Sequence, residues 1–495
     1  MNALEELKKE NQKLHQTIQV LQEQIDWFRR QIFGKRSEKI ITNESQLVFN
    51  ELIHHEEKIP HQKQTIKSHE RVKPIRDGHD KVSLPPDLPI ERVVIDLPKE
   101  QKVCQETGNP LVQIGEEISR KLAHKPGSYY VKEIIRPKYA NPKKSEEGVK
   151  TADLPPSLLT RCQVDDSFLA DLLVKKYADH LPLNRVSEIM GRDNIFISRQ
   201  LLSQWVLKCG DALKPLHDEM TRQILKSENV FIDEIPVKML DPGMGKTKFT
   251  YMWVLCGGQE SNPPCRVYNF RTDRQHHHAA EILNNYKGVV HSDKYGAYEK
   301  LAATKQFTWC PCWVHIRRKF IEAEHGDKDF RDMVLKKIYQ LFQEEEIAWT
   351  KPPDERLRLR QEIEVPLIDE LTQKIKERLI KGTVLPKSNF KEALGYYCSL
   401  IPYLKNYALH PWARLDNNVS ERAVRPIALG RKNWLFLGNN EGGEAAAVIL
   451  SLVQTCRALH INPRIYLEDV MVKLMDYNSQ KLVELLPHNW IKNIP

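Results

Sequence analysis

The stretch Asn229-Val230-Phe231-Ile232-Asp233-Glu234-Ile235-Pro236 is an apolar run, rich in β-branched and aromatic residues, that two adjacent carboxylates interrupt. We interpret it as a central strand that carries Asp233. Burying an unpaired carboxylate is costly unless something compensates its charge, and a divalent cation would do so. Glu234 is expected to face the other side of the sheet, because side chains alternate along a strand.

Two further carboxylates occur in settings that can bring them to the same cation. Asp293 ends the apolar run Gly288-Val289-Val290-His291-Ser292, and Glu421 lies inside a stretch with the pattern of a helix. Oxygen ligands from two strand ends and one helix suit Mg²⁺ or Mn²⁺. Because any long chain offers such trios of carboxylates, the spacing alone does not identify a site.

Four blocks of the sequence stand out together, namely Phe231–Glu234, His291–Tyr298, Cys312–Phe320 and Asp416–Pro426. In this order they resemble the DDE transposases of bacterial insertion sequences, most closely the family numbered sixty-six. The resemblance covers nearly the whole chain. It implies that Asp233, Asp293 and Glu421 form the catalytic triad and hold two Mg²⁺ or Mn²⁺ ions.

The composition sets broad limits on the class of protein. At 495 residues, a prior of one domain per roughly 150 residues predicts about three domains. A net charge of +9 is compatible with DNA binding but too small to establish it. Nine cysteines without a secretory signal, and no apolar run near the roughly 20 residues that span a bilayer, argue against secreted and membrane proteins. We expect a cytoplasmic, nucleoid-associated bacterial protein with no membrane partner.

The N-terminal residues carry a heptad repeat in which Asn11 is the one polar member of the apolar seam. Mainly Ile at the first core position, Leu at the second and one buried Asn favour a parallel dimer. We therefore predict a homodimeric coiled coil over residues 1–36, with an amphipathic helix packed on its own protein as the alternative. Residues 37–90 are polar, end in prolines and are predicted to form a flexible linker.

Residues 91–150 contain short strand-like runs and many lysines. Members of the resembled family carry a CxxC pair on each side of this segment. Here Thr107 stands where the thiol after Cys104 belongs, and residues 139–143 contain no cysteine. One thiolate cannot complete a tetrahedral zinc site, so we expect no zinc and predict a degenerate β module that binds DNA.

The rest of the chain changes its periodicity near residue 227. Before it, residues 155–226 have helical periodicity with Ser198 as an N-cap, and they form either a DNA-binding helical domain or structural packing. After it come strand-like runs at 230–240, 248–257 and 266–269, a helix at 279–286, and further strands at 288–292 and near 307–313.

That order is what an RNase H-like fold needs. The predicted fold is a multidomain α/β protein whose RNase H-like catalytic domain, residues 227–440, contains a helical insertion at 321–395. A C-terminal helical domain follows at 441–495, with Asn462 and Pro463 starting its last long helix.

Basic and amide side chains near the triad are predicted to contact DNA, because guanidinium groups suit phosphate recognition. They are His315, Arg317, Arg318, Lys319, Asn417, Asn418, Arg422, Arg425, Arg431 and Lys432. Two stretches that contain histidine could instead bind a metal ion. We interpret Cys310, Cys312 and His315 as buried thiols beside a histidine, and residues 276–278 as a surface cluster that precedes a helix.

These predictions describe a dimeric transposase that cuts the terminal inverted repeats of its own element and joins the 3′-hydroxyl ends to target DNA. Accessory proteins encoded by the element are a further partner class. Two alternatives stay open at this point: an RNase H-like nuclease without strand transfer, and a catalytically decayed DNA-binding protein.

Deletion of residues 1–33 is expected to remove the dimer contact while leaving the catalytic fold intact, because the heptad seam ends there. Processing of paired DNA ends should then fall. Analytical ultracentrifugation checks the prediction. A truncated chain that sediments as the same dimer as the full chain would show that the seam is not the principal contact.

Overall fold

The computed structural model describes Gly127, Tyr129, Cys162 and residues 138–140, 149–151, 156–159, 164–241, 243–257, 264–304, 306–324, 326–382 and 384–490. The predicted coiled coil, the linker and most of the β module lie outside these residues. Of the β module, the structure describes an antiparallel pair, β1 (Lys138–Ala140) and β2 (Val149–Thr151).

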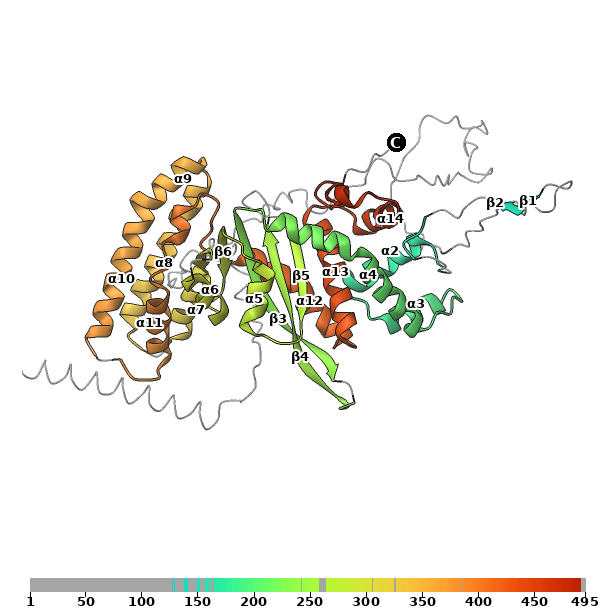
Figure 1. Cartoon of the computed structure of the whole chain (residues 1–495). Coiled ribbons are helices and arrows are strands. Elements are labelled where there is room, and N and C mark those ends of the chain that lie inside the picture. The colour runs from blue at the N-terminus through green and yellow to red at the C-terminus, as the bar shows by residue number, and fades with distance from the viewer. Residues whose placement is uncertain are drawn as a thin grey trace, which may run out of the picture. The chain divides into compact units, whose positions relative to one another are not determined.

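A five-stranded mixed sheet lies at the centre of the fold, with strand order β5-β4-β3-β6-β7 (Figure 1). Its strands are β3 (Asn229–Asp241), β4 (Lys246–Gly257), β5 (Cys265–Arg271), β6 (Val289–Ser292) and β7 (Thr308–Pro311). The first three form an antiparallel meander, whereas β6 and β7 join the other side of β3 in parallel. All five predicted strands are confirmed.

The burial of β3 explains its central place. Its first residues, Asn229–Ile232, are buried because they lie between β4 and β6, as the continuous apolar run requires. Beyond β6 the strand continues as a hairpin with β4, where exposed and buried residues alternate. Gly243 and Gly245 provide the positive φ angles of the turn.

Helices cover the sheet and connect its strands. Near the sheet these are α5 (His276–Leu283), α6 (Gly296–Ala303), α7 (Trp313–Glu322), α12 (Asn418–Trp434) and α13 (Asn440–Ala458). The helix α12 packs on β3 and β4, and α13 packs on β5. A Cβ on Gly443 would come within 2.6 Å of the Phe270 ring, so glycine permits the close approach of α13 to β5.

The helical domain predicted at 155–226 packs onto the same structure through α13. It contains α2 (Asp166–Tyr177), α3 (Leu183–Gly191) and α4 (Arg199–Ile224). Ser198 caps α4 as predicted, its hydroxyl accepting a hydrogen bond from the Leu201 amide at 3.3 Å. The periodicity did not predict α3, and α4 continues past an internal proline, Pro215. At the C-terminal end lie α14 (Pro463–Leu474), capped by Asn462 as predicted, and the 3₁₀ helix η7 (Ser479–Leu485).

Between β7 and α12, where the sequence predicts an insertion at 321–395, the chain forms a helical bundle that runs from Lys328 to Leu409 (Figure 1). It comprises α8 (Lys328–Trp349), α9 (Pro353–Leu359), the π-helix η5 (Arg360–Glu364), α10 (Val365–Ile380), α11 (Asn389–Leu400) and the 3₁₀ helix η6 (Asn406–Leu409). Among the residues described, no helix combines the length and the apolar character needed to cross a membrane.

A buried arginine ties the insertion to the segment that leads into α12. The guanidinium of Arg360 is fully buried and donates to both carboxylate oxygens of Glu345, at 2.8 and 2.5 Å. It also donates to the carbonyls of His410 and Ala413, each at 2.8 Å. Because every one of these donors has an acceptor, the arginine fixes the loop before α12 against the bundle.

Candidate active site

The parallel pairing of β3 with β6 places two aspartates side by side. Phe231 lies opposite His291, and their rings stack with centroids 4.3 Å apart. Two residues further along, β3 reaches Asp233 and the chain leaving β6 reaches Asp293. In a parallel ladder, residues at equal steps from a pair stay adjacent, so both carboxylates meet where β6 ends.

The start of α12 is anchored against the same strand. Asn417 is fully buried, and its side-chain amide donates to the Ile232 carbonyl of β3 at 3.1 Å. Its backbone amide approaches the Cys312 sulfur at 3.3 Å. These contacts fix the first turn of α12, which carries Glu421.

Burial raises the pKa of all three predicted triad carboxyls, and the charges of neighbouring acids raise it further for Asp233 and Glu421. For Asp233, burial raises the pKa well above its usual value, and the charges of Glu234, Asp293 and Glu421 raise it further. Burial also raises the pKa of Asp293, and it raises the pKa of Glu421 together with the charges of Asp416 and Asp293. The structure therefore brings the three predicted residues into one electrostatic cluster.

The cluster also contains unsatisfied acceptors. Buried oxygens of Asp293 (Oδ1) and Glu421 (Oε1) have no hydrogen-bond partner among the described residues. Acceptor-only oxygens that repel one another in a buried setting are the donor set that a hard divalent cation satisfies. The residues present therefore fit the cation that the sequence predicts.

Glu234 differs from its neighbour in having a counter-charge. Its side chain is 1% exposed, and Arg274 donates to one oxygen through Nε at 2.7 Å. The hydroxyl of Tyr298 donates to the other oxygen at 2.9 Å. One of two adjacent carboxylates is thus neutralised within the protein, whereas Asp233 is not. Sequence reasoning missed Arg274 and Tyr298, since neither belongs to a pattern that includes Glu234.

His315, on α7, lies against the triad. Its Nε2 is 3.4 Å from Glu421 Oε1, without hydrogen-bond geometry. Burial lowers the pKa of His315 to about 3, and Arg318 and Lys319 contribute, so the ring is neutral at neutral pH. Ligand atoms of Cys312, His315 and Glu421 all lie within 4.8 Å of one another. Cys310 and Cys312 are buried, as predicted, and burial raises the pKa of both thiols.

The predicted DNA-binding residues divide by exposure. Those on the surface are Arg318, Arg422, Arg425 and Lys432, and those partly exposed are His315, Arg317, Lys319, Asn418 and Arg431. Two of the latter already have protein partners: Lys319 donates to Glu392 at 2.7 Å, and Arg431 donates to the Pro236 carbonyl at 2.7 Å. Asn417 is a correction, because its complete burial and its bond to β3 keep it from DNA.

Comparison with known families gives matches over most of the chain. Residues 161–445 match the Transposase IS66 family, residues 451–488 match the IS66 C-terminal element, and residues 20–93 match a family described as Transposase C of IS166 homeodomain. The first match covers more than half of the chain. The chain therefore belongs to the IS66 family of transposases, and this membership supports a transposase role, DNA as a partner and the use of a divalent metal.

Three similar proteins come from Sinorhizobium fredii (strain NBRC 101917 / NGR234), and each is named as uncharacterized. The protein y4hP is 29% identical over 96% of this chain and 89% of its own length. For y4qI the identity is 31% over 77% of this chain and 72% of that protein. For y4jD the identity is 30%, over 82% of this chain and 81% of that protein. The likeness therefore extends across most of each protein.

Asn417→Ala is expected to lower the free energy of unfolding by about 1–3 kcal/mol, because it leaves a buried carbonyl of β3 without its donor. Cleavage should fall as well, since Glu421 loses its anchored helix start. Asn418→Ala is the matched control and should cost under about 0.5 kcal/mol. Chemical denaturation measures both variants, and equal losses would contradict an anchoring role for Asn417.

Asp233→Asn is expected to stabilise the protein when metal is absent. Because the pKa of Asp233 is raised in the folded protein, deprotonation opposes folding above the ordinary pKa of aspartate, and each tenfold change in proton affinity corresponds to about 1.4 kcal/mol. The gain in stability of the variant over the wild type should therefore appear above the ordinary pKa of aspartate and should grow until the pH reaches the raised pKa. Thermal unfolding in a chelator, from pH 4 to pH 8, measures this dependence. A wild-type protein as stable as the variant throughout would contradict the repulsion described here.

Proposed function

We propose that this chain is a transposase that cuts DNA at the ends of its element and joins the 3′-hydroxyl ends to target DNA. The observation that carries the proposal is the convergence of Asp233, Asp293 and Glu421, from β3, the end of β6 and α12. Membership of the IS66 family supports the same function, because that family consists of transposases.

We further propose that the sheet is an RNase H-like core. If the five strands are numbered by their order along the chain, they lie across the sheet in the order 3-2-1-4-5. Only the second strand, β4, is antiparallel to its neighbours. The sequence predicts such a core from the order of these strands and helices along the chain. The arrangement supports the proposal by placing one carboxylate on the first strand and another directly after the fourth.

The residues of the site would divide the work by their positions. When bound, Mg²⁺ or Mn²⁺, two ions per site, would supply activation of the attacking oxygen and stabilisation of the leaving oxygen. Asp233, Asp293 and Glu421 would hold the ions, because the charges of Asp293 and Glu421 both raise the pKa of Asp233 and a cation would relieve that repulsion. His315 stays neutral, and its Nε2 lies 3.4 Å from Glu421 Oε1, so a small rotation of the ring would let Nε2–H donate to that carboxylate and orient it.

DNA would be held by the exposed cations around this site. Arg318 on α7 and Arg422 and Arg425 on α12 are exposed, and guanidinium groups bind phosphate oxygens in pairs. Arg318 also lowers the pKa of Asp293 and of Glu421, which indicates that it lies near the triad. In this proposal the substrate is the terminal inverted repeats, with target DNA and a partner copy joined through residues 1–36.

A strand-transfer assay tests the proposal. Wild-type protein should join a pre-cut element end to a target duplex in the presence of Mg²⁺. Asp293→Asn and Glu421→Gln should reduce both cleavage and joining by at least about 10³-fold. Their DNA binding should persist, since each change removes charge but little volume. Glu346→Gln, at an exposed position on α8, is the control and should be fully active.

The assay distinguishes the alternatives. Cleavage without joining would replace the proposal with a nuclease. Tight DNA binding without cleavage of any end would replace it with a decayed, DNA-binding relative of the family.

A further inference from the structure

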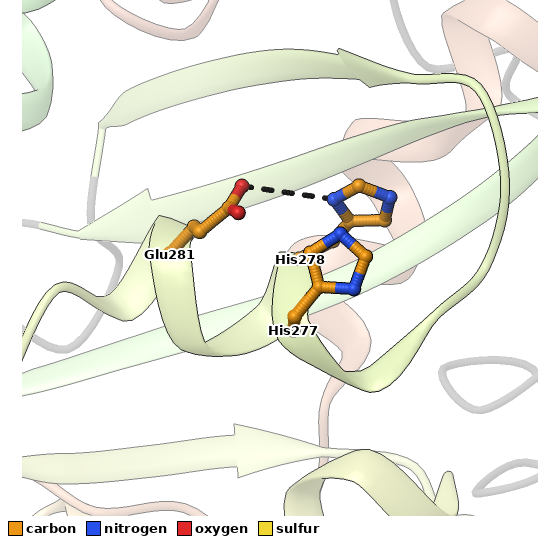
Figure 2. Close-up of side chains that lie close together, drawn as sticks. All are labelled: His277, His278 and Glu281. Carbon is orange, nitrogen blue, oxygen red and sulfur yellow. Dashed lines mark ion pairs between the residues drawn. The ribbon is translucent and has the colours of Figure 1, made fainter.

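Two imidazoles and a carboxylate meet at the start of α5, outside the residues assigned above. His277, His278 and Glu281 lie together there, with the Glu281 carboxylate directed toward the His278 ring (Figure 2). Residues three and four positions apart share a helix face, so Glu281 can reach both histidines. One ligand atom from each side chain lies within 4.8 Å of the other two.

The sequence predicted that His278 belongs to a surface cluster. This prediction is wrong, because His278 is buried, with 7% of its surface exposed. Its Nε2 lies 2.9 Å from Asp273 Oδ1. An ionised carboxylate only accepts hydrogen bonds, so Nε2 must carry the proton. The other ring nitrogen, Nδ1, is then an acceptor.

That acceptor is left in an unfavourable position. His278 Nδ1 is buried without a hydrogen-bond partner, and the nearest charged atom is Glu281 Oε2 at 3.7 Å. Two lone-pair atoms therefore face each other. Arg271 compensates the carboxylate only in part, since its Nε is 3.6 Å from the same oxygen and does not reach the imidazole.

We propose that His277, His278 and Glu281 bind a transition-metal ion, with Zn²⁺ as the best fit. A second proton on His278 would satisfy His278 Nδ1 and Glu281 Oε2 but would leave His277 without a role. A metal ion would bind all three side chains. Two imidazoles and one carboxylate are a common ligand set for zinc, with water in the remaining position.

The geometry needs only small adjustments. Tetrahedral zinc with bonds of about 2.0–2.2 Å requires ligand atoms about 3.3–3.6 Å apart. The pair formed by His278 Nδ1 and Glu281 Oε2 is already close to this at 3.7 Å. His277 and Glu281 are exposed, so their side chains are free to close the remaining distance.

Asp273 supplies a feature that metal sites commonly share. A histidine ligand usually donates its other N–H to a carboxylate, which fixes the tautomer and orients the ring. Asp273 does this for His278 and is followed by Arg274, the partner of Glu234. A bound ion would therefore also restrain the loop that carries Arg274, whose guanidinium neutralises Glu234 beside Asp233.

The sequence-based expectation of no zinc rested on the missing cysteines of residues 91–150. It treated the histidine run as exposed. The buried, unpartnered Nδ1 of His278 is the observation that changes this interpretation.

Calorimetric titration with Zn²⁺ tests the proposal. The protein is the full chain without an affinity tag, stripped with a chelator and carrying Asp233→Asn and Glu421→Gln, so that Zn²⁺ binding at the carboxylate triad is weakened and does not dominate the titration. One Zn²⁺ per chain is expected to bind. His277→Ala and Glu281→Gln should each weaken binding by at least about tenfold, and Asp273→Asn by about tenfold.

His276→Ala is the matched control, because it removes a histidine of the same run whose ring stacks on Tyr295 instead, with centroids 5.7 Å apart. Its affinity for Zn²⁺ should equal that of the same chain with His276 intact. Visible absorption with Co²⁺ as the probe should show a site of low coordination number that the His277 and Glu281 variants lose. No stoichiometric binding, or binding that neither variant weakens, would overturn the proposal.

Discussion

The structure depends on the packing of three partly buried carboxylates whose charges are only partly compensated within the protein. Burial raises the pKa values of Asp233, Asp293 and Glu421, and the charge of Asp293 raises those of the other two further. Such a cluster opposes folding unless the surrounding contacts hold it in place. Much of the described architecture can be understood as the means by which these contacts are supplied.

The supporting contacts come from distant parts of the chain. The pairing of β3 with β6 sets the distance between the two aspartates, and Asn417 anchors α12 to β3. The insertion contributes through Arg360, whose hydrogen bonds hold the loop that leads to α12. A helical bundle inserted between two parts of the candidate site can therefore help to position Glu421 from a distance.

The adjacent residues Asp233 and Glu234 differ in how the protein compensates their charges. Glu234 has an arginine and a tyrosine hydroxyl, so its charge is satisfied. Asp233 accepts one backbone hydrogen bond, from the Glu234 amide at 2.9 Å, and otherwise faces other acids. Strand alternation alone therefore assigns two different roles to neighbouring residues of the same type.

The sequence predicted the five strands because they depend on a local signal, namely apolar runs bounded by turn residues. The predicted triad came from the resemblance to a transposase family, because acidic residues near such runs do not identify a site by themselves. The sequence did not predict the burial of Asn417 or of His278, because each depends on a partner brought in by the tertiary fold. Asn417 bonds to a strand 185 residues away in sequence. In an amide-rich helix start or a run of histidines, the pattern is the same whether the side chains face solvent or the core.

Anomalous diffraction at the manganese edge, from crystals of the protein grown with Mn²⁺ and DNA ends, tests the central claim most directly. The account predicts anomalous peaks about 2.0–2.6 Å from carboxylate oxygens of Asp233, Asp293 and Glu421. A structure in which manganese contacts none of these three residues, or in which Glu421 points away from the two aspartates, would contradict it.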